Sequence, residues 1–361
     1  MTDGAGGDRL DLTGAVDAVE RFLLEGTPSL TRDQVLEQSG VAEEVAKELW
    51  RWLGFPQADH DDVAFTPLDV ASLRQAVELV ELGVLTEDRQ AALVRTWGRS
   101  FARLAEWQTT LLADVALEEG VGDPVARVAE LAEEVLPRVE ALQAYVWRRH
   151  LVSAAGRLLA IDAPGAPAAP LAVVFVDIVG YTFRSKSLDE AGLVGWLEGF
   201  ESVCTDIAVE HGGRVIKNIG DEVLLVADDP AAAAAAALAM VERGADEDDP
   251  FPQVRAGMAY GEVVSRLGDV FGPTVNIAAR LTSIARPGTV LVDRGAYRTL
   301  SGRADDGDDS GDGTPGSAET SDETSDETDA GDLPFRFRRV RRTSVKGYSR
   351  LQPWVLRRAV G

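Results

Sequence analysis

The sequence predicts an all-α domain over residues 1–161 followed by an α/β domain over residues 171–361. In the first part, apolar residues recur at the three-to-four-residue spacing of amphipathic helices, without the two-residue alternation of strands. In the second part, short apolar runs such as LAVVFV (171–176) and VLLVA (223–227) are separated by longer helical stretches. Residues 162–170 (DAPGAPAAP) hold three prolines, which helices and central strands do not tolerate, so we place a linker there.

The composition is that of a globular protein, and it disfavours several classes of partner. Among 361 residues, 60 acidic side chains outnumber 36 basic ones, and the net charge of −24 argues against polyanions such as nucleic acid. No apolar run approaches the roughly eighteen residues of a membrane helix, and the N-terminus lacks a signal-peptide pattern. The lone Cys204 forbids an internal disulfide. We therefore expect a cytoplasmic protein that binds neither nucleic acid nor membranes.

The helical domain contains a segment with the spacing of a helix-turn-helix, residues 31–54, with its turn at Gly40. The residues that follow are similar to those of winged-helix regulators of the MerR kind. Residues 31–54 hold three basic against five acidic side chains, which disfavours contact with DNA. The stretch from Leu136 to Ile161 is predicted to form a long helix that leads into the second domain, with Pro137 in its first turn. Five of the seven tryptophans lie in the helical domain and are expected in its core, with a site for an apolar effector as the alternative.

Residues 304–332 are expected to form a disordered acidic insertion. They contain twelve carboxylates, no Lys or Arg, and the near repeat TSDETSDETD. The tail from Arg336 to Arg358 carries nine basic residues and no acidic one. Attraction between the two segments is one interpretation, and a solvated acidic loop without a role is the other.

Asp177 stands at the end of the first predicted strand, where the chain continues as IVGYT into a helical stretch. A glycine turn at Gly180 and a helix start can present backbone amides to phosphate oxygens, and Asp177 supplies the carboxylate that Mg²⁺ prefers. An aspartate that caps a helix produces the same pattern. The corner therefore predicts a phosphate or metal site only in combination with other motifs.

The run RVIKNIGDEVLLVA (214–227) predicts a hairpin, with Lys217 entering the turn and Asp221 leaving it. If Asp177 and Asp221 meet at neighbouring strand ends, they can hold two divalent ions about 4 Å apart, as in enzymes of phosphoryl transfer. The alternative is that Asp221 is a simple turn residue.

A third motif, GDVFGPTVNIAARL (268–281), predicts a helix that begins near Pro273 and places Asn276 and Arg280 on one face. An arginine there can stabilise the charge on a phosphoryl group, and an asparagine can orient a sugar. Solvated side chains on a helix surface give the same spacing.

Together, the motifs FVDIVGYT, IKNIGDEV and GDVFGPTVNIAARL resemble those of the class III nucleotidyl cyclases. The resemblance runs from about Leu171 to the C-terminus, apart from the acidic insertion, and implies a ferredoxin-like α+β catalytic domain. The roles that it implies are metal binding by Asp177 and Asp221, purine recognition by Lys217 and Asp269, ribose and transition-state contacts by Asn276 and Arg280, and, in some members, triphosphate binding by Lys346.

A cationic donor beside a carboxylate acceptor fits adenine, so the pair Lys217 and Asp269 predicts ATP as substrate. The resemblance implies conversion of ATP to cyclic AMP and pyrophosphate with two Mg²⁺ or Mn²⁺ ions per site, in a homodimer whose active sites are shared between protomers. Glu222 departs from many relatives, which have a small residue there, so it either faces solvent or disturbs the metal pair.

The helical domain resembles the N-terminal regulatory module of a subset of actinobacterial class III cyclases, which implies that it regulates the cyclase. Our hypothesis is that protonation of His150, in the long predicted helix, biases two arrangements of that helix. An exposed histidine without a role is the alternative.

Three other functions compete with an adenylate cyclase: a guanylate cyclase, a catalytically silent nucleotide-binding module, and a DNA-binding regulator with a cyclase-like sensor domain. All six family positions carry the expected residue types, which argues against a silent module. The charge balance of the helix-turn-helix segment argues against the DNA-binding regulator.

Overall fold

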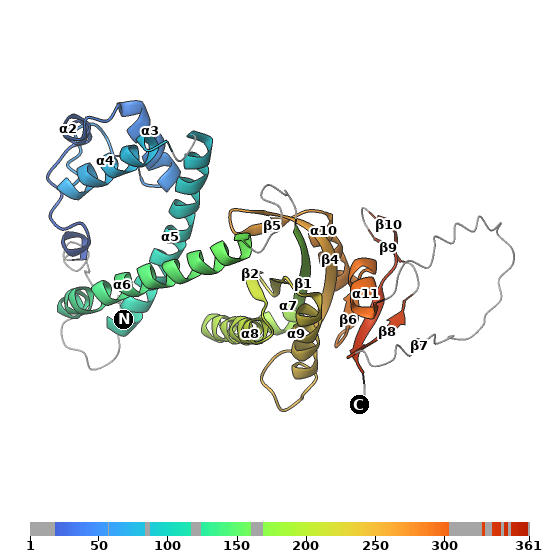
Figure 1. The fold of residues 1–361 in the computed structure, drawn as a ribbon. Coiled ribbons are helices and arrows are strands. Elements are labelled where there is room, and N and C mark those ends of the chain that lie inside the picture. The colour runs from blue at the N-terminus through green and yellow to red at the C-terminus, as the bar shows by residue number, and fades with distance from the viewer. Residues whose placement is uncertain are drawn as a thin grey trace, which may run out of the picture. The chain divides into compact units, whose positions relative to one another are not determined.

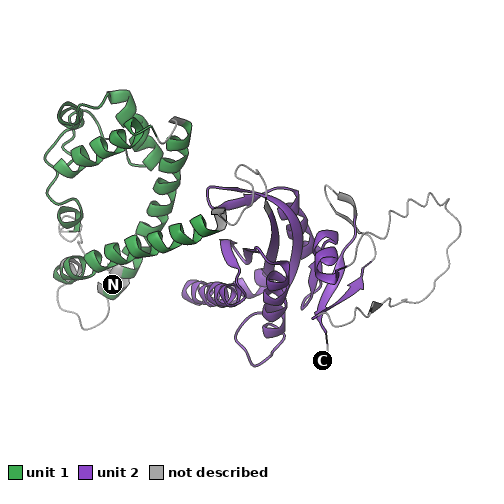
Figure 2. Cartoon of the chain, viewed as in Figure 1, with its two compact units in different colours: residues 1–160 green, residues 161–361 purple. Residues whose placement is uncertain are grey.

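A computed structural model describes residues 19–56, 58–83, 87–116, 124–159, 169–302, 327–328, 334–340, 343–345 and 348–359. The chain divides into two compact units, residues 1–160 and 161–361 (Figure 2). Each unit is described by itself below.

Unit 1 is helical, as expected, and its helices are α2 (Arg32–Ser39), α3 (Glu43–Leu53), α4 (Pro67–Glu81), α5 (Glu87–Ala116) and α6 (Pro124–Leu159). The predicted turn at Gly40 separates α2 from α3 and has a left-handed φ of 72°, which favours glycine. Val35, Leu49 and Leu73 are among the buried residues that join α2, α3 and α4 in one small core. The helix-turn-helix spacing is therefore built around apolar contacts between these helices.

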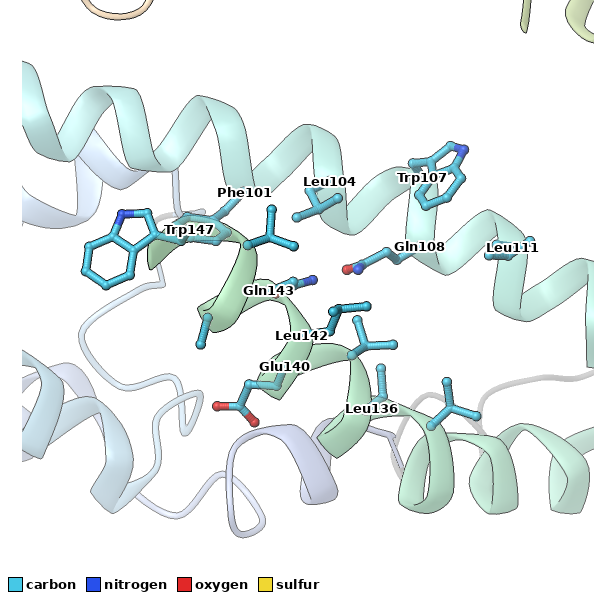
Figure 3. A pocket seen from close by; sticks show the side chains of 14 residues that line it. Phe101, Leu104, Trp107, Gln108, Leu111, Leu136, Glu140, Leu142, Gln143 and Trp147 are labelled. Carbon is cyan, nitrogen blue, oxygen red and sulfur yellow. The ribbon is translucent and has the colours of Figure 1, made fainter. Parts of the chain in front are cut away.

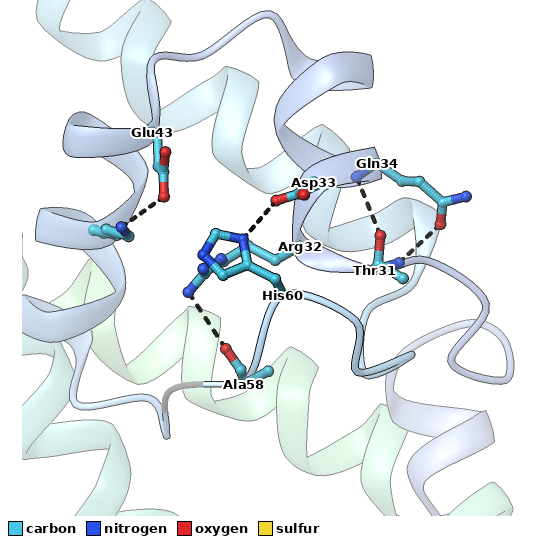
Figure 4. Close-up of polar contacts among 8 residues, drawn as sticks. Thr31, Arg32, Asp33, Gln34, Glu43, Ala58 and His60 are labelled. Atoms are coloured by element: carbon cyan, nitrogen blue, oxygen red, sulfur yellow. Dashed lines mark hydrogen bonds and ion pairs between the residues drawn. The ribbon is translucent and has the colours of Figure 1, made fainter.

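Polar contacts fix the start of α2 (Figure 4). Thr31 and Gln34 form a reciprocal capping box, which satisfies backbone amides at the helix N-terminus. The loop before α4 is tied to the same helix, because Arg32 Nη1 donates to the Ala58 carbonyl oxygen at 3.4 Å and His60 Nδ1 lies 3.0 Å from Asp33 Oδ1.

The long helix α6 begins twelve residues before the predicted Leu136, so the expected boundary is wrong. Pro124 takes the first helical position, which suits proline, and Pro137 lies inside the helix. An internal proline costs a backbone hydrogen bond. Buried Leu131 and Ala132 on its N-terminal side provide packing that lets the helix extend in that direction.

Unit 2 is built on one large sheet (Figure 1). Its strands are β1 (Ala169–Ile178), β2 (Arg214–Ile219), β3 (Glu222–Ala227), β4 (Val254–Arg266), β5 (Asp269–Phe271), β6 (Val290–Val292), β7 (Glu327–Thr328), β8 (Phe335–Arg339), β9 (Thr343–Val345), β10 (Tyr348–Leu351) and β11 (Trp354–Arg358). Its helices are α7 (Tyr181–Ser185), α8 (Glu190–Glu210), α9 (Pro230–Arg243), α10 (Pro273–Ile284) and α11 (Arg294–Ser301).

The strand order confirms the ferredoxin-like expectation. The sheet runs β2-β3-β1-β4-β6-β11-β8-β7, with β5 paired to β4 and β9-β10 as a separate pair. The first four strands and the helices α8 and α9 follow the split βαβ pattern, with β1 antiparallel to both β3 and β4. One face of the sheet packs on α8, α9 and α11, and the other packs on α10.

Strand β1 is covered on both faces, which explains why its sequence is continuously apolar rather than alternating. Residues 171–176 are all buried, and they alternate between the two cores on opposite faces of the sheet. The strand begins at Ala169, inside the predicted linker, and Pro170 pairs only with β4 there because the pairing with β3 starts at Ala172. Proline is tolerated at such a one-sided position.

The predicted acidic insertion lies largely outside the described residues. Its described part is β7, in which Glu327 and Thr328 pair with β8, and the expectation of disorder for the insertion stays a prediction. None of the described helices combines the length and apolar character that a membrane span requires.

Candidate active site

The first motif forms a corner at the end of β1, which carries Asp177 as its next-to-last residue. Gly180 follows with a left-handed φ of 73° and is the N-cap of α7. A Cβ at this position would meet no atom within 4 Å, so the backbone angle rather than crowding calls for glycine. The amide of Ile178 donates to the carbonyl oxygen of Asp221 at 3.1 Å, which joins this corner to the second motif.

That hydrogen bond brings the β2–β3 turn, and with it Asp221, beside Asp177. The turn contains Gly220 with a φ of 65°, as the predicted hairpin requires. Burial raises the pKa of Asp177, Arg255 opposes this shift, and the neighbouring Asp221 carboxyl raises that pKa further. The two aspartates predicted as a pair therefore lie together at adjoining strand ends.

Two charged side chains flank Asp177 on the neighbouring strands. Glu222 of β3 and Arg255 of β4 are both its register partners, so the three side chains share one face of the sheet. Arg255 donates to Asp177 Oδ2 from Nε at 2.7 Å and lies 2.6 Å from it through Nη2. The motifs in the sequence do not point to Arg255, for which the only signal is that a charged residue stands inside an otherwise apolar strand.

Glu222 lies beside the aspartate pair and is half-buried rather than fully exposed to solvent, and whether it disturbs a metal pair stays a prediction. Burial, followed by the negative charges of Asp177 and Asp221, raises the pKa of Glu222 to about 7. The residue is only partly exposed and faces the aspartate pair. The charges of Asp177 and Asp221 thus act on Glu222, and Arg255 is the cation that opposes them.

The carboxylates at this edge suit a divalent ion whose remaining ligands come from the phosphates of a bound nucleotide. Carboxylate oxygens are the ligands that Mg²⁺ and Mn²⁺ prefer. No three His, Cys, Asp or Glu side chains converge as a ready metal site in the described part of the chain. Mg²⁺ is commonly held by one or two carboxylates with substrate phosphates and water, which matches the pair Asp177 and Asp221.

A second polar group lies on β2 and β5. Lys217 Nζ donates to Asp269 Oδ2 at 2.5 Å across 52 positions of sequence. The other oxygen of Asp269 accepts from the Val270 amide at 2.8 Å, which fixes the orientation of the carboxylate. The side chains of Lys217 and Asp269 are 41% and 28% exposed, so a planar polar ligand can reach both. The two residues that the resemblance assigns to the purine are therefore direct neighbours.

The third motif forms α10, which begins at Pro273 as predicted. Thr274 anchors its first turn by donating to the Glu262 carbonyl oxygen at 2.7 Å. Asn276 and Arg280 are exposed one turn apart, and their side chains make no hydrogen bond or ion pair with other described residues. Within one chain, no contact among the described residues joins this pair to Asp177 and Asp221. Lys346 lies outside the described residues.

The helical unit contains an apolar groove between α5 and α6, with a volume of about 750 Å³ (Figure 3). Phe101, Leu142 and Trp147 are among its lining residues. Trp107 and Trp147 are 58% exposed, so the expectation that the tryptophans of this domain fill its core is wrong for these two. The helical spacing of apolar residues correctly indicated the apolar faces that line this groove. Nothing in the described part of unit 1 covers them.

His150 lies on α6 with an exposed ring. Its ring makes no hydrogen bond or ion pair with any residue that the structure describes. The titration hypothesis for His150 therefore stays a prediction without a contact to support it.

Comparison with known proteins identifies the family to which the chain is similar. A protein named adenylate cyclase from Glutamicibacter nicotianae is 39% identical over 303 residues, which cover 79% of this chain and 75% of that protein. Another adenylate cyclase, from Streptomyces coelicolor, is 38% identical over 283 residues, covering 76% and 72% of the two chains. The crystal structure of the adenylyl cyclase CyaB from P. aeruginosa aligns with a TM-score of 0.40 at 20% identity, over 54% of this chain and 96% of that one. The adenylate and guanylate cyclase catalytic domain matches residues 165–357, more than half of the sequence, and the chain belongs to this family.

Proposed function

We propose that this chain is an adenylate cyclase that converts ATP to 3′,5′-cyclic AMP and pyrophosphate at the site formed by the three motifs. Membership of the cyclase family supports the cyclisation, and the relatives named adenylate cyclase support ATP as the substrate. The single observation that carries the choice of purine is the contact between Lys217 and Asp269.

The two purines present opposite hydrogen-bonding edges to such a pair. Adenine offers a ring-nitrogen acceptor beside an amino donor, and guanine offers a ring N–H donor beside a carbonyl acceptor. Lys217 can donate to the ring nitrogen of adenine while Asp269 accepts from its amino group. Guanine would set a donor against Lys217 and an acceptor against Asp269, which disfavours GTP.

The reaction needs no protein nucleophile. The ribose 3′-oxygen attacks the α-phosphorus, a new O–P bond forms, the bond from the α-phosphorus to the β-phosphate bridging oxygen breaks, and pyrophosphate leaves while the hydroxyl proton passes to solvent. Asn276 would hold the ribose so that its 3′-oxygen faces the phosphorus. Arg280 would stabilise the charge that develops on the phosphoryl oxygens.

Asp177 and Asp221 would hold the divalent ions, two Mg²⁺ or Mn²⁺ per site. When bound, such ions neutralise charge on the phosphate oxygens and on the attacking and leaving oxygens. Arg255 keeps Asp177 oriented and favours its ionised, ligating form. The backbone at Gly180, which is the N-cap of α7, would contact the phosphates.

The active sites are shared between two protomers of a homodimer. Asn276 and Arg280 stand exposed without partners among the described residues, although the reaction needs them at the same phosphate as the aspartates. A second copy of the chain can bring its own α10 to the Asp177 and Asp221 edge. One copy would then contribute the two metal-binding aspartates, and the other copy would contribute the side chains that contact the ribose and the phosphoryl group.

The helical unit regulates this site. The groove between α5 and α6 is large and almost wholly apolar, so it suits an apolar effector rather than a charged one. Its α6 wall is also the helix that precedes the catalytic unit in the sequence. A shift of α6 on ligand binding would change how two catalytic units meet.

The purine choice is tested by measuring turnover of ATP and GTP in wild type and in Asp269→Asn. We expect wild type to prefer ATP. We expect Asp269→Asn to lose about tenfold or more in kcat/KM for ATP, because a neutral amide oxygen is a weaker acceptor for the adenine amino group than a carboxylate, while the amide NH₂ can donate to a guanine carbonyl. Asp206→Asn, an exposed position on α8, is the matched control and should change nothing. Equal use of ATP and GTP by wild type, or an unchanged ratio in Asp269→Asn, would contradict the proposal.

A further inference from the structure

Two neighbouring strands of the catalytic sheet, β8 and β11, place exposed arginines on the face that packs on α10. Arg336 and Arg338 alternate with the two buried phenylalanines of β8, which pack in the core on the opposite face with α8, α9 and α11. On β11, Val355 is buried in a cluster with Leu281 of α10, so Arg357, two residues further on, lies on this face as well. Three exposed guanidinium groups therefore share one face of the sheet.

Two of these arginines face each other directly across the strands. Arg336 of β8 is the register partner of Arg357 of β11, and like charges in opposite positions destabilise strand pairing. The next residue of β11, Arg358, lies on the other face and binds the Glu242 carboxylate with Nε–O distances of 2.8 and 2.9 Å. None of the three arginines on the α10 face forms such an ion pair with a residue that the structure describes. The opposed pair is therefore suited to a counter-ion from outside the described chain.

The elements that surround this pair contribute no negative charge. The described elements β6, β8, β10, β11 and α10, together with the loop 285–289, contain no Asp or Glu. The acidic register partner that β8 has is Glu327 of β7, which lies opposite Arg338 and not opposite Arg336. On a chain with a net charge of −24, the face around Arg336 and Arg357 is therefore a local region of positive charge.

This positive region lies at the same end of the sheet as the predicted metal ligands. The strand registers align one row of buried residues, which all face the core formed with α8, α9 and α11: Val176, Ala256, Val290, Leu356 and Phe337. The next row towards the end of β1 faces α10 and contains Asp177, Arg255, Arg357 and Arg336. Because β11 is three strands from β1, Arg357 lies about 14 Å from Asp177 along the sheet, at about 4.8 Å per strand. The arginines therefore lie near the aspartate pair but apart from it.

The charge and spacing of the three arginines suit a small anion with two phosphoryl groups. A planar guanidinium group forms paired hydrogen bonds with phosphate oxygens. The opposed arginines have Cβ atoms about 5 Å apart, so both can hold one phosphoryl group, and Arg338 stands about 7 Å along β8 from Arg336, within reach of a second group. A nucleic acid or a membrane extends beyond the Debye length of about 10 Å and meets the negative charge of the rest of the chain. A small diphosphate does not.

We propose that Arg336, Arg338 and Arg357 form a second phosphate site, which binds a diphosphate group, with free pyrophosphate as its source. The anion supplies the counter-ion that the opposed arginines lack among the described residues. The site itself follows from β8 and β11, whereas the choice of pyrophosphate rests on the proposed function, in which pyrophosphate is a product. Pyrophosphate that leaves the aspartate pair then meets a binding site on the same face of the sheet.

Equilibrium binding of labelled pyrophosphate to the full-length chain, at low salt and with EDTA, tests the site. Without divalent ions the aspartate pair repels pyrophosphate, so binding reports the arginines. We expect wild type to bind pyrophosphate, and Arg336→Gln with Arg357→Gln to weaken its affinity by about tenfold or more. The matched control, Arg339→Gln with Arg358→Gln, removes the same charge from the opposite face of the same two strands and should bind as wild type does. No binding by wild type, or an equal loss in the control, would overturn the proposal.

Competition by ATP and by inorganic phosphate identifies the source of the diphosphate group. We expect ATP to displace labelled pyrophosphate no more tightly than unlabelled pyrophosphate does, because the proposed contacts involve only phosphoryl oxygens. We expect phosphate to compete at least about tenfold more weakly, because one phosphoryl group does not reach both the opposed pair and Arg338. Tighter competition by ATP would assign the site to a nucleotide, and equal competition by phosphate would remove Arg338 from it. Either result would overturn the proposal.

Two further measurements separate this site from the active site. Asp221→Ala should bind pyrophosphate in EDTA with wild-type affinity, because the arginines and not the aspartates hold the anion. Arg336→Gln with Arg357→Gln should keep the wild-type kcat and KM for ATP when pyrophosphatase removes the product, which also reports that the variant is folded. Loss of binding in Asp221→Ala, or a raised KM in the arginine variant, would place the arginines in the substrate site and overturn the proposal. Binding in EDTA involves no turnover, so its outcome is independent of whether the chain is a cyclase.

Discussion

At the residue scale, the protonation state of Asp177 depends on its burial and on charges from strand β4 and the β2–β3 turn. Burial and the Asp221 carboxyl favour its protonated form, and the Arg255 guanidinium favours the ionised form. Metal binding requires the ionised form, so Arg255 acts against the cost of burying Asp177. The interaction between Arg255 and Asp177 is stronger than that of an ion pair on an exposed surface, because the side chain of Asp177 is only 14% exposed.

We therefore predict that Arg255→Ala lowers cyclase kcat/KM by about 10- to 100-fold and raises the Mg²⁺ or Mn²⁺ concentration needed for half-maximal activity. Arg255→Lys should retain part of the activity, since it keeps the charge but loses the two-nitrogen contact. Metal titration of steady-state activity measures both effects. Metal dependence identical to wild type in Arg255→Ala would show that Arg255 does not position Asp177.

At the element scale, α11 is held to the sheet by one buried carboxylate. Asp293 Oδ1 accepts from the Ala296 amide at 2.8 Å, capping α11, and from the Tyr260 amide of β4 at 3.1 Å. Burial raises the pKa of Asp293 above its ordinary value of 3.8, although the backbone hydrogen bonds oppose the shift. A raised folded-state pKa means that the stability contributed by the protonated form is present below 3.8 and is lost as pH rises through the folded-state value.

We predict that the melting temperature of wild type minus that of Asp293→Asn falls as pH is raised from about 4 towards neutrality, because only wild type develops a buried charge. Asp293→Ala should destabilise unit 2 by about 1–3 kcal/mol at all these pH values, since two amides lose their acceptor. Asp189→Asn, at the exposed cap of α8, is the control. A difference that rises with pH would reverse the sign assigned here.

A close helix contact in unit 1 gives a second test at this scale. A Cβ on Gly98 of α5 would lie 2.4 Å from the Leu53 carbonyl oxygen of α3, whereas a Cβ on Gly156 of α6 would meet nothing within 4 Å. Gly98→Ala should therefore destabilise unit 1 by about 1–3 kcal/mol through overpacking. Gly156→Ala should stabilise it by about 0.5–1 kcal/mol through helix propensity. Thermal unfolding followed by circular dichroism compares them, and equal effects would contradict the close contact.

The elements differ in how far the sequence predicted them. Strand β1, the hairpin at Asp221 and the start of α10 at Pro273 followed from local signals, namely a continuous apolar run, a glycine turn and a proline. The contact of Lys217 with Asp269 came from family resemblance, because no local signal links residues 52 positions apart. Arg255 and the buried setting of Glu222 depend on strand register, which a single sequence does not specify. The start of α6 was predicted too late in the sequence, because proline favours the first turn of a helix and Pro137 was therefore taken to mark that turn.

At the scale of the whole molecule, each unit exposes a surface that no described residue of the same unit covers. The α5–α6 groove exposes Trp107 and Trp147, and α10 exposes Asn276 and Arg280. Periodicity shows which face of a helix is apolar or polar, but it does not show what that face contacts. A second copy of the chain is the partner that the proposed shared active site would require.

The central claim is that one site takes Asp221 from one protomer and Arg280 from its partner, and mixing two inactive variants tests it most directly. Asp221→Ala and Arg280→Ala should each lose nearly all cyclase activity. After subunit exchange in an equal mixture, half of the dimers should contain one intact site, so activity should recover to about a quarter of wild type. A mixture no more active than its components would show that each site is built from a single chain and would contradict the account.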